Sequence, residues 1–135
     1  MVYFLDTNAI SDLMRQNAKV MAQLALVGPP DELRICTIVR GEILFGIDRL
    51  PPGKKQNDLR ERASSVFAYV DCQPIPPSSA TKYSQIRCIL EKTGFTLGEN
   101  DLWIAACAMD VDAFLVTRDQ AFRQISGLKI LDWTQ

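Results

Sequence analysis

The chain has 135 residues, 47% of them hydrophobic and 23% charged, and a net charge of −1. These values predict one globular domain with its own core and exclude a disordered or membrane-bound chain. No histidine is present and the four cysteines are widely spaced, which excludes the usual zinc sites and the Cys/His and Ser/His catalytic pairs. A hydrolase built from this chain must therefore use carboxylates, a metal ion or both.

The N-terminal stretch "MVYFLDTN" carries too few apolar residues before its acid to be a signal peptide or a membrane span. We therefore expect a cytoplasmic protein that does not bind membranes, with cysteines that are reduced and mostly buried.

Hydrophobic periodicity and capping signals predict strands alternating with helices in the first half of the chain. Asn8 or Ser11 is the expected cap of the first helix, and Thr37 of the third. The predicted elements are a strand over 2–5, a helix to about 15, a helix over about 18–27, a strand over 33–36 and a helix over 38–50.

The second half begins with a solvated loop, "PPGKKQND", and the later stretch "CQPIPP" reads as a connector. Ser78 or Ser79 is expected to start a long helix that Gly94 ends. The remaining predicted elements are helices over 59–70, 100–109 and 119–124 and strands over 113–117 and 129–131.

Alternating strands and helices are typical of an α/β fold. We expect three layers, with a mostly parallel central sheet of four to five strands flanked by helices on both faces. In such sheets ligands bind outside the carboxyl ends of the strands.

Four acids are predicted to meet at that edge. Asp6 ends the first strand, and Glu42 lies about one turn into the helix after the second, with its side chain tilted back toward the helix start. The helix that begins near Asp101 is about 15 Å long at ~1.5 Å per residue. The strand that returns to Asp119 is about 16 Å long at ~3.3 Å per residue, so both acids reach the same level.

Each acid also has a purely structural explanation. Asn100 can cap a helix whose dipole stabilises an acid at Asp101, and Asp6 and Asp119 suit turns after strands. Glu99 is as consistent with a solvent-facing position as with a functional one. A cluster of four carboxylates, however, raises its own pKa values and favours a bound cation, and oxygen donors alone suit Mg²⁺ or Mn²⁺. Hydrolysis of a phosphodiester is the reaction that such a site favours.

Polar and basic residues near the four acids are candidates for supporting roles. Thr7, Asn8, Asn100 and Thr117 can orient ligands or water, although each also suits a cap or a turn. Arg40 and Arg118 are candidate phosphate contacts.

Four stretches in order resemble the motifs of PIN-domain nucleases, and their spacing most resembles the VapC-type toxins of toxin-antitoxin pairs: "FLDTNAISDL", "RGEILFGI", "ENDLWIAACA" and "LVTRDQAF". The resemblance implies a PIN-like fold over residues 1–135 and a metal-dependent endoribonuclease that cuts RNA and inhibits translation and growth. It also implies that Asp6, Glu42, Asp101 and Asp119 surround Mg²⁺ or Mn²⁺. A homodimer and a cognate antitoxin are the implied partners.

Two other functions compete with this one. A receiver-like signalling domain also places acids around Mg²⁺, but it needs adjacent acids after the first strand and a lysine near the end, where this chain has a lone Asp6 and no lysine after "LVT". A PIN fold that only binds a partner has no reason to keep four repelling carboxylates together.

Overall fold

A computed structural model describes every residue from Met1 to Gln135. Its five strands form one sheet in the order β3-β2-β1-β4-β5, and all neighbouring strands are parallel. The predicted parallel α/β fold is therefore confirmed. The strands are β1 (Val2–Leu5), β2 (Glu32–Cys36), β3 (Asp71–Gln73), β4 (Phe114–Val116) and β5 (Lys129–Leu131).

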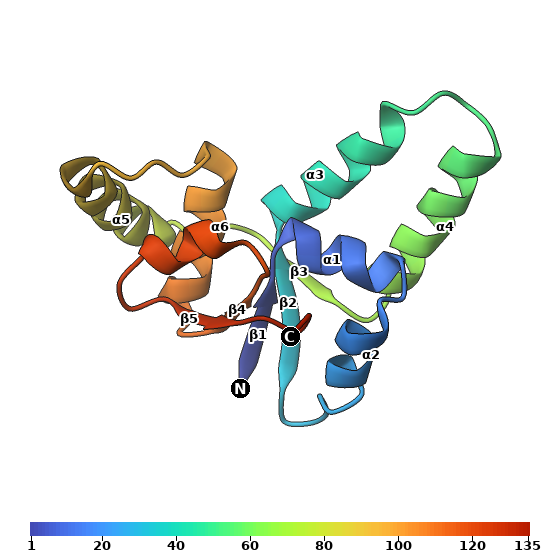
Figure 1. Cartoon of the computed structure of the whole chain (residues 1–135), viewed down its shortest axis with the longest axis horizontal. Coiled ribbons are helices and arrows are strands. Elements are labelled where there is room, and N and C mark those ends of the chain that lie inside the picture. The colour runs from blue at the N-terminus through green and yellow to red at the C-terminus, as the bar shows by residue number, and fades with distance from the viewer.

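Helices cover both faces of the sheet (Figure 1). The first four lie on one side of the strands, and α3 and α4 lean outward as a helical hairpin, while α5 and α6 pack against each other on the other side. The helices are α1 (Thr7–Met14), α2 (Ala18–Leu24), α3 (Thr37–Asp48), α4 (Lys54–Phe67), α5 (Ser79–Thr93), α6 (Glu99–Asp110) and a short 3₁₀ helix, η1 (Gln120–Gln124).

The strand order reverses between β1 and β4. From β1 the chain adds β2 and β3 on one side, then crosses back to place β4 on the other side of β1. Right-handed crossovers then put the helices of the two halves on opposite faces, which leaves a crevice at the reversal point. Leu5 pairs with Val116 there, so the residues that follow both strands emerge side by side.

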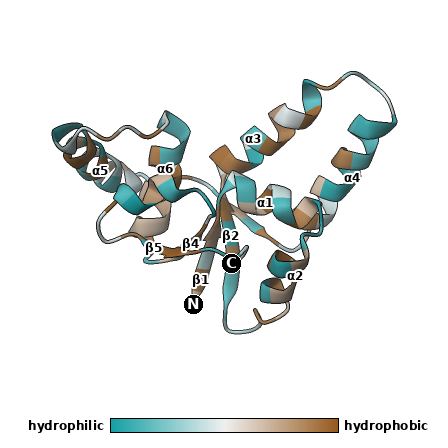
Figure 2. Ribbon diagram, in the orientation of Figure 1, coloured by the Kyte–Doolittle hydropathy of each residue, from teal (hydrophilic) through white to brown (hydrophobic).

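One continuous core of 29 buried hydrophobic residues holds the layers together. The two central strands β1 and β4 are apolar throughout, whereas β2 and the helices mix polar and apolar residues (Figure 2). Ile104, Ala105 and Ala106 of α6 are fully buried, and the small alanine side chains let this helix approach the sheet closely. None of the helices combines the length and the apolar run that a membrane span needs.

Several predicted boundaries were wrong. Residues predicted as loop before 59 form the first turn of α4, which begins at Lys54; Lys and Gln favour helix there without an apolar face to reveal it. Residues 71–73, predicted to lie outside any strand, form β3, which pairs only with β2. A strand of three residues is too short to show a recognisable hydrophobic pattern.

The predicted helix caps also differ. Asp6, rather than Asn8 or Ser11, caps α1 by accepting a hydrogen bond from the Ala9 amide. Thr37 is the first residue of α3 instead of its cap, and α6 begins at Glu99, one residue before Asn100.

The four cysteines are free, as expected, but fewer of them are buried than we expected. Cys36 and Cys107 are buried, Cys72 is half-buried and Cys88 is exposed.

Gly94 ends α5 as predicted, with a left-handed backbone at φ 79°. Because a Cβ atom is strained in that region, we expect Gly94→Ala to lower the free energy of unfolding by about 1 kcal/mol and the melting temperature by roughly 4 °C. Gly28→Ala is the matched control, since Gly28 has ordinary φ and open space around it. Equal melting temperatures for the two variants in thermal denaturation would contradict this account.

Candidate functional site

Asp6 occupies the reversal point of the sheet, between the end of β1 and the start of α1. Its carboxylate is buried, with 3% of the residue exposed. One oxygen accepts a hydrogen bond from the Ala9 amide at 2.8 Å, and the other accepts one from the Thr117 hydroxyl at 2.5 Å. Burial raises the pKa of Asp6 to about 6; the two hydrogen bonds oppose that rise, and the charges of Asp101 and Asp119 add to it.

Thr117 connects two of the predicted acids. It follows β4, is buried, and besides donating to Asp6 it accepts a hydrogen bond from the Asp119 amide at 3.0 Å. Asp119 in turn caps η1, because its carboxylate accepts a hydrogen bond from the Ala121 amide at 2.9 Å. The loop after β4 is thereby held next to Asp6.

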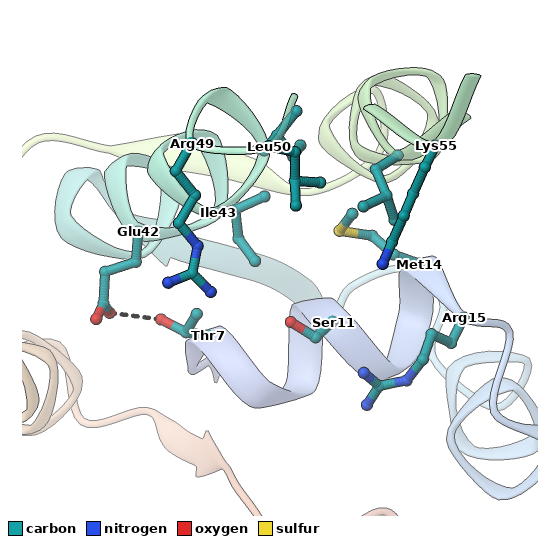
Figure 3. Close-up of a pocket in the computed structure, with 12 residues that line it drawn as sticks. Thr7, Ser11, Met14, Arg15, Glu42, Ile43, Arg49, Leu50 and Lys55 are labelled. Atoms are coloured by element: carbon teal, nitrogen blue, oxygen red, sulfur yellow. Dashed lines mark hydrogen bonds between the residues drawn. The ribbon is translucent and has the colours of Figure 1, made fainter. Parts of the chain in front are cut away.

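Glu42 belongs to α3 and reaches the same edge from the other side of β1. The Thr7 hydroxyl donates a 2.6 Å hydrogen bond to its carboxylate, so the first residue of α1 orients Glu42 (Figure 3).

Asp101 lies in the first turn of α6 and is half-buried. Burial raises its pKa, and the charges of Glu42 and Asp119 raise it further. The four predicted acids therefore lie on one edge and repel one another. No three acidic or cysteine side chains stand close enough together to hold one metal ion.

Two supporting candidates have no hydrogen-bonded role. The Asn8 side chain is half-buried and forms no hydrogen bond, and Asn100 is exposed, where it lines an open cleft together with Thr7 and Glu42. Glu99 contacts α5 instead of the other acids: its carboxylate accepts a hydrogen bond from the Tyr83 hydroxyl and lies 3.6 Å from the Arg87 guanidinium.

The candidate phosphate contacts are both exposed. The Arg40 guanidinium stacks 4.5 Å above the ring of Phe67. Arg118 uses its Nε to bind Asp12 at 3.1 Å.

Asp12 is a residue that the sequence interpretation missed. It is buried, with 4% exposed, and it binds Arg15 at 2.5 Å as well as Arg118. It thus ties the loop after β4 to α1, next to Asp6 and Thr117. An acid in the core-facing row of α1, between Ala9 and Leu13, was the signal that could have identified it.

Two hollows border the acidic edge. The first, the three-helix cavity, has a volume of about 370 Å³ and lies between α1, α3 and α4. The second, the α3 cleft, is more open at about 600 Å³ and runs along α3 to Asn100. Both are lined by Thr7, Glu42, Gly46 and Arg49, so they meet beside the Thr7–Glu42 hydrogen bond.

The fold and the site define an α/β protein with an acidic site at the point where the strand order reverses. The family model of the PIN domain matches residues 3–128, and the chain belongs to this family. A receiver-like domain is therefore excluded. Over the whole length of both chains it is 30% identical to a protein named Ribonuclease VapC1 from Haemophilus influenzae.

Solved structures extend the likeness to three dimensions. The structure of VapBC-1 from nontypeable Haemophilus influenzae contains a chain that matches with a TM-score of 0.87 and 29% identity over the whole of both chains. VapBC2 from Rickettsia felis, solved bound to a DNA fragment from its promoter, matches with a TM-score of 0.89 and 25% identity over 97% of this chain and 98% of that one.

The two ion pairs of Asp12 predict that this residue stabilises the fold and takes no part in the reaction. Asp12→Asn keeps the shape but loses the charge that binds two arginines, so we expect the free energy of unfolding in urea to fall by about 1–2 kcal/mol. Asp58→Asn is the control, because Asp58 is exposed on α4 and has no ion pair or hydrogen bond through its side chain. The account is wrong if both variants unfold at the same urea concentration as the wild type.

Proposed function

We infer that this chain is an endoribonuclease toxin of the VapC type, which hydrolyses phosphodiester bonds of RNA. The observation that carries the inference is the set of four carboxylates from four separate connections at the carboxyl edge of a PIN fold. A relative named as a ribonuclease, aligned over its full length, supports the same reaction.

We propose that Mg²⁺ or Mn²⁺ is the cofactor, with Asp6, Glu42, Asp101 and Asp119 as its ligands. All four donors are carboxylate oxygens, which these hard cations prefer. Burial is the main cause of the raised pKa values of Asp6 and Asp101, and the repulsion from neighbouring acids that adds to it would be relieved by a bound cation. Their present spacing requires the carboxylates to turn toward one another to share an ion. When bound, such an ion supplies a more acidic water and stabilises negative charge on the phosphoryl group.

The protein's own residues would divide the remaining work. Asp6 is fixed by two hydrogen bonds, which makes it the rigid member of the set. Glu42 is held only through Thr7, so it can move. Thr117 positions Asp6 and Asp119, while Asn8 and Asn100 are proposed to orient water or substrate.

Arg40 and Arg118 are proposed to contact phosphate. Arg118 binds Asp12 through Nε alone, and both terminal nitrogens of its guanidinium stay free. A cation near the scissile group would offset the repulsion between the acidic edge and the RNA backbone.

The partners follow from the same proposal. The matched structures from Haemophilus influenzae and Rickettsia felis are described as VapBC assemblies, which supports a cognate antitoxin for this chain as well. We further propose a homodimer that acts on RNA in the cytoplasm and inhibits translation and growth.

Cleavage of RNA is the direct test. Purified protein should cut RNA in the presence of Mg²⁺ or Mn²⁺, and Asp101→Asn and Asp6→Ala should each reduce the rate by at least about 100-fold, because each removes one charge from the site. Gel-resolved products and circular dichroism spectra together separate lost chemistry from lost folding. Asp58→Asn should cut at the wild-type rate. Equal cutting by all variants would identify a contaminating nuclease, and a folded wild type that never cuts would favour a PIN fold that only binds partners.

Metal binding can be tested separately, through the melting temperature of the protein. A cation that binds only the folded state at 100 times its dissociation constant adds about 2.7 kcal/mol, so Mn²⁺ should raise the melting temperature of the wild type by several degrees. The same titration should leave the Asp6→Ala, Asp101→Asn double variant unchanged. If the wild type shows no shift and no bound Mn²⁺ by calorimetry, the proposed ligand set is wrong.

A further inference from the structure

One face of α3 carries an acid, an aromatic ring and a cation in succession. Glu42, Phe45 and Arg49 are spaced by three and four residues, which places them along the same side of the helix. All three line the α3 cleft. The face therefore continues from the acidic site for about 10 Å, at ~1.5 Å per residue.

Phe45 has no partner within the chain that explains its position. It is 67% exposed, although it belongs to the last turn of α3 and lines the cleft beside the candidate active site. A planar apolar ring at the wall of a polar cleft is the feature that proteins use to stack unpaired bases.

Arg49 is a cation without a counter-ion. Its side chain enters no ion pair and no hydrogen bond, unlike Arg15 and Arg118, which share Asp12. Its guanidinium turns into the three-helix cavity, toward Thr7 and Ser11 (Figure 3). Lys55 lines the same cavity and is also unpaired. The cavity thus holds an excess of positive charge next to Glu42, which suits an anionic group.

Two glycines open the same cleft. Gly41 and Gly46 lie within α3, where glycine costs roughly 0.5–1 kcal/mol relative to alanine. Neither has an atom within 4 Å of the place a Cβ would take, so packing inside the chain does not require them. Both line the α3 cleft, and their missing side chains keep it wide enough for a ligand to approach the helix backbone.

We propose that Phe45 and Arg49 form a nucleotide subsite beside the proposed catalytic acids, with an unpaired RNA base stacked on Phe45 and a backbone phosphate bound by Arg49 at the mouth of the three-helix cavity. The two side chains are one helical turn apart, a span that a base and a phosphate of one nucleotide can bridge. Phe45 and Arg49 are positioning residues, because neither touches the bond that is cut. The assignment rests on the proposed ribonuclease function.

A nucleotide fits this face better than a protein surface does. An apolar partner surface would cover Phe45, but it would leave Arg49 and Lys55 of the three-helix cavity without a counter-charge. A nucleotide supplies a planar base for the ring and a negative charge for Arg49 and Lys55 at once.

The test compares four substitutions in steady-state cleavage of an unstructured, mixed-sequence RNA oligonucleotide. Phe45→Ala should raise KM roughly tenfold with a smaller effect on kcat, since base stacking contributes to binding, and Phe45→Trp should restore it. Arg49→Gln should also raise KM and should lower the slope of log KM against log salt by about 0.7, the value for one phosphate contact on a single strand. Arg49→Lys should retain the slope.

Matched controls lie away from both hollows. Ile89→Ala removes a comparably exposed apolar side chain on α5, and Arg123→Gln removes an exposed cation on η1. Both should leave KM and the salt slope at wild-type values.

A steric variant tests the cleft independently of Phe45 and Arg49. Gly46→Leu places a side chain into open space without a clash and favours helix, so the melting temperature should not fall while KM rises. Anisotropy of labelled RNA in an Asp101→Asn background should give the same order of affinities without cleavage.

The outcomes separate the subsite from the reaction. A folded wild type that does not cut RNA overturns the proposed function. Cleavage with unchanged KM in both Phe45→Ala and Gly46→Leu overturns the subsite alone. If those variants instead change only the oligomeric state in light scattering, α3 is an interface between copies of this chain and the subsite is also overturned.

Discussion

The buried carboxylate of Asp6 is the constraint on which the rest of the site depends. A charged group with 3% exposure is costly unless hydrogen bonds and nearby dipoles compensate for the lost water. Here the compensation comes from the start of α1 and from Thr117, so the same carboxylate begins a helix and fixes the loop after β4. Asp6 therefore caps α1 and is at the same time one of the four acids of the proposed active site.

Residues bonded to Asp6 or next to it in the chain fix the positions of two other acids. Thr7 follows Asp6 directly and orients Glu42, while Thr117, which donates to Asp6, also accepts a hydrogen bond from the Asp119 amide. Asp101 is held differently, since no hydrogen bond fixes its side chain and its place depends on the buried alanines and Ile104 that seat α6 against the sheet. Two of the acids are thus reached through hydrogen bonds, and one through packing.

The sequence predicted the placement of the four acids because simple geometry governs it: strand ends and helix starts of a parallel sheet share one edge. It did not predict β3 or the first turn of α4, since three strand residues and one solvated helical turn leave no periodic pattern. Asp12 was missed because its partner Arg118 is 106 positions away, a pairing that only the folded chain brings together. The exposure of Phe45 was missed for a related reason, because the sequence does not show which side of α3 other elements cover.

The two outer strands of the sheet have a consequence for how other molecules can attach. β3 and β5 each contain three residues, so each free edge offers only a few backbone donors and acceptors for an added strand. Binding of a strand from another molecule would therefore form few backbone hydrogen bonds at these edges. The same holds for edge-to-edge aggregation, to which longer edge strands are prone. Recognition of this chain falls to its side chains, on the outward surfaces of the helices and along the rim where the acids stand.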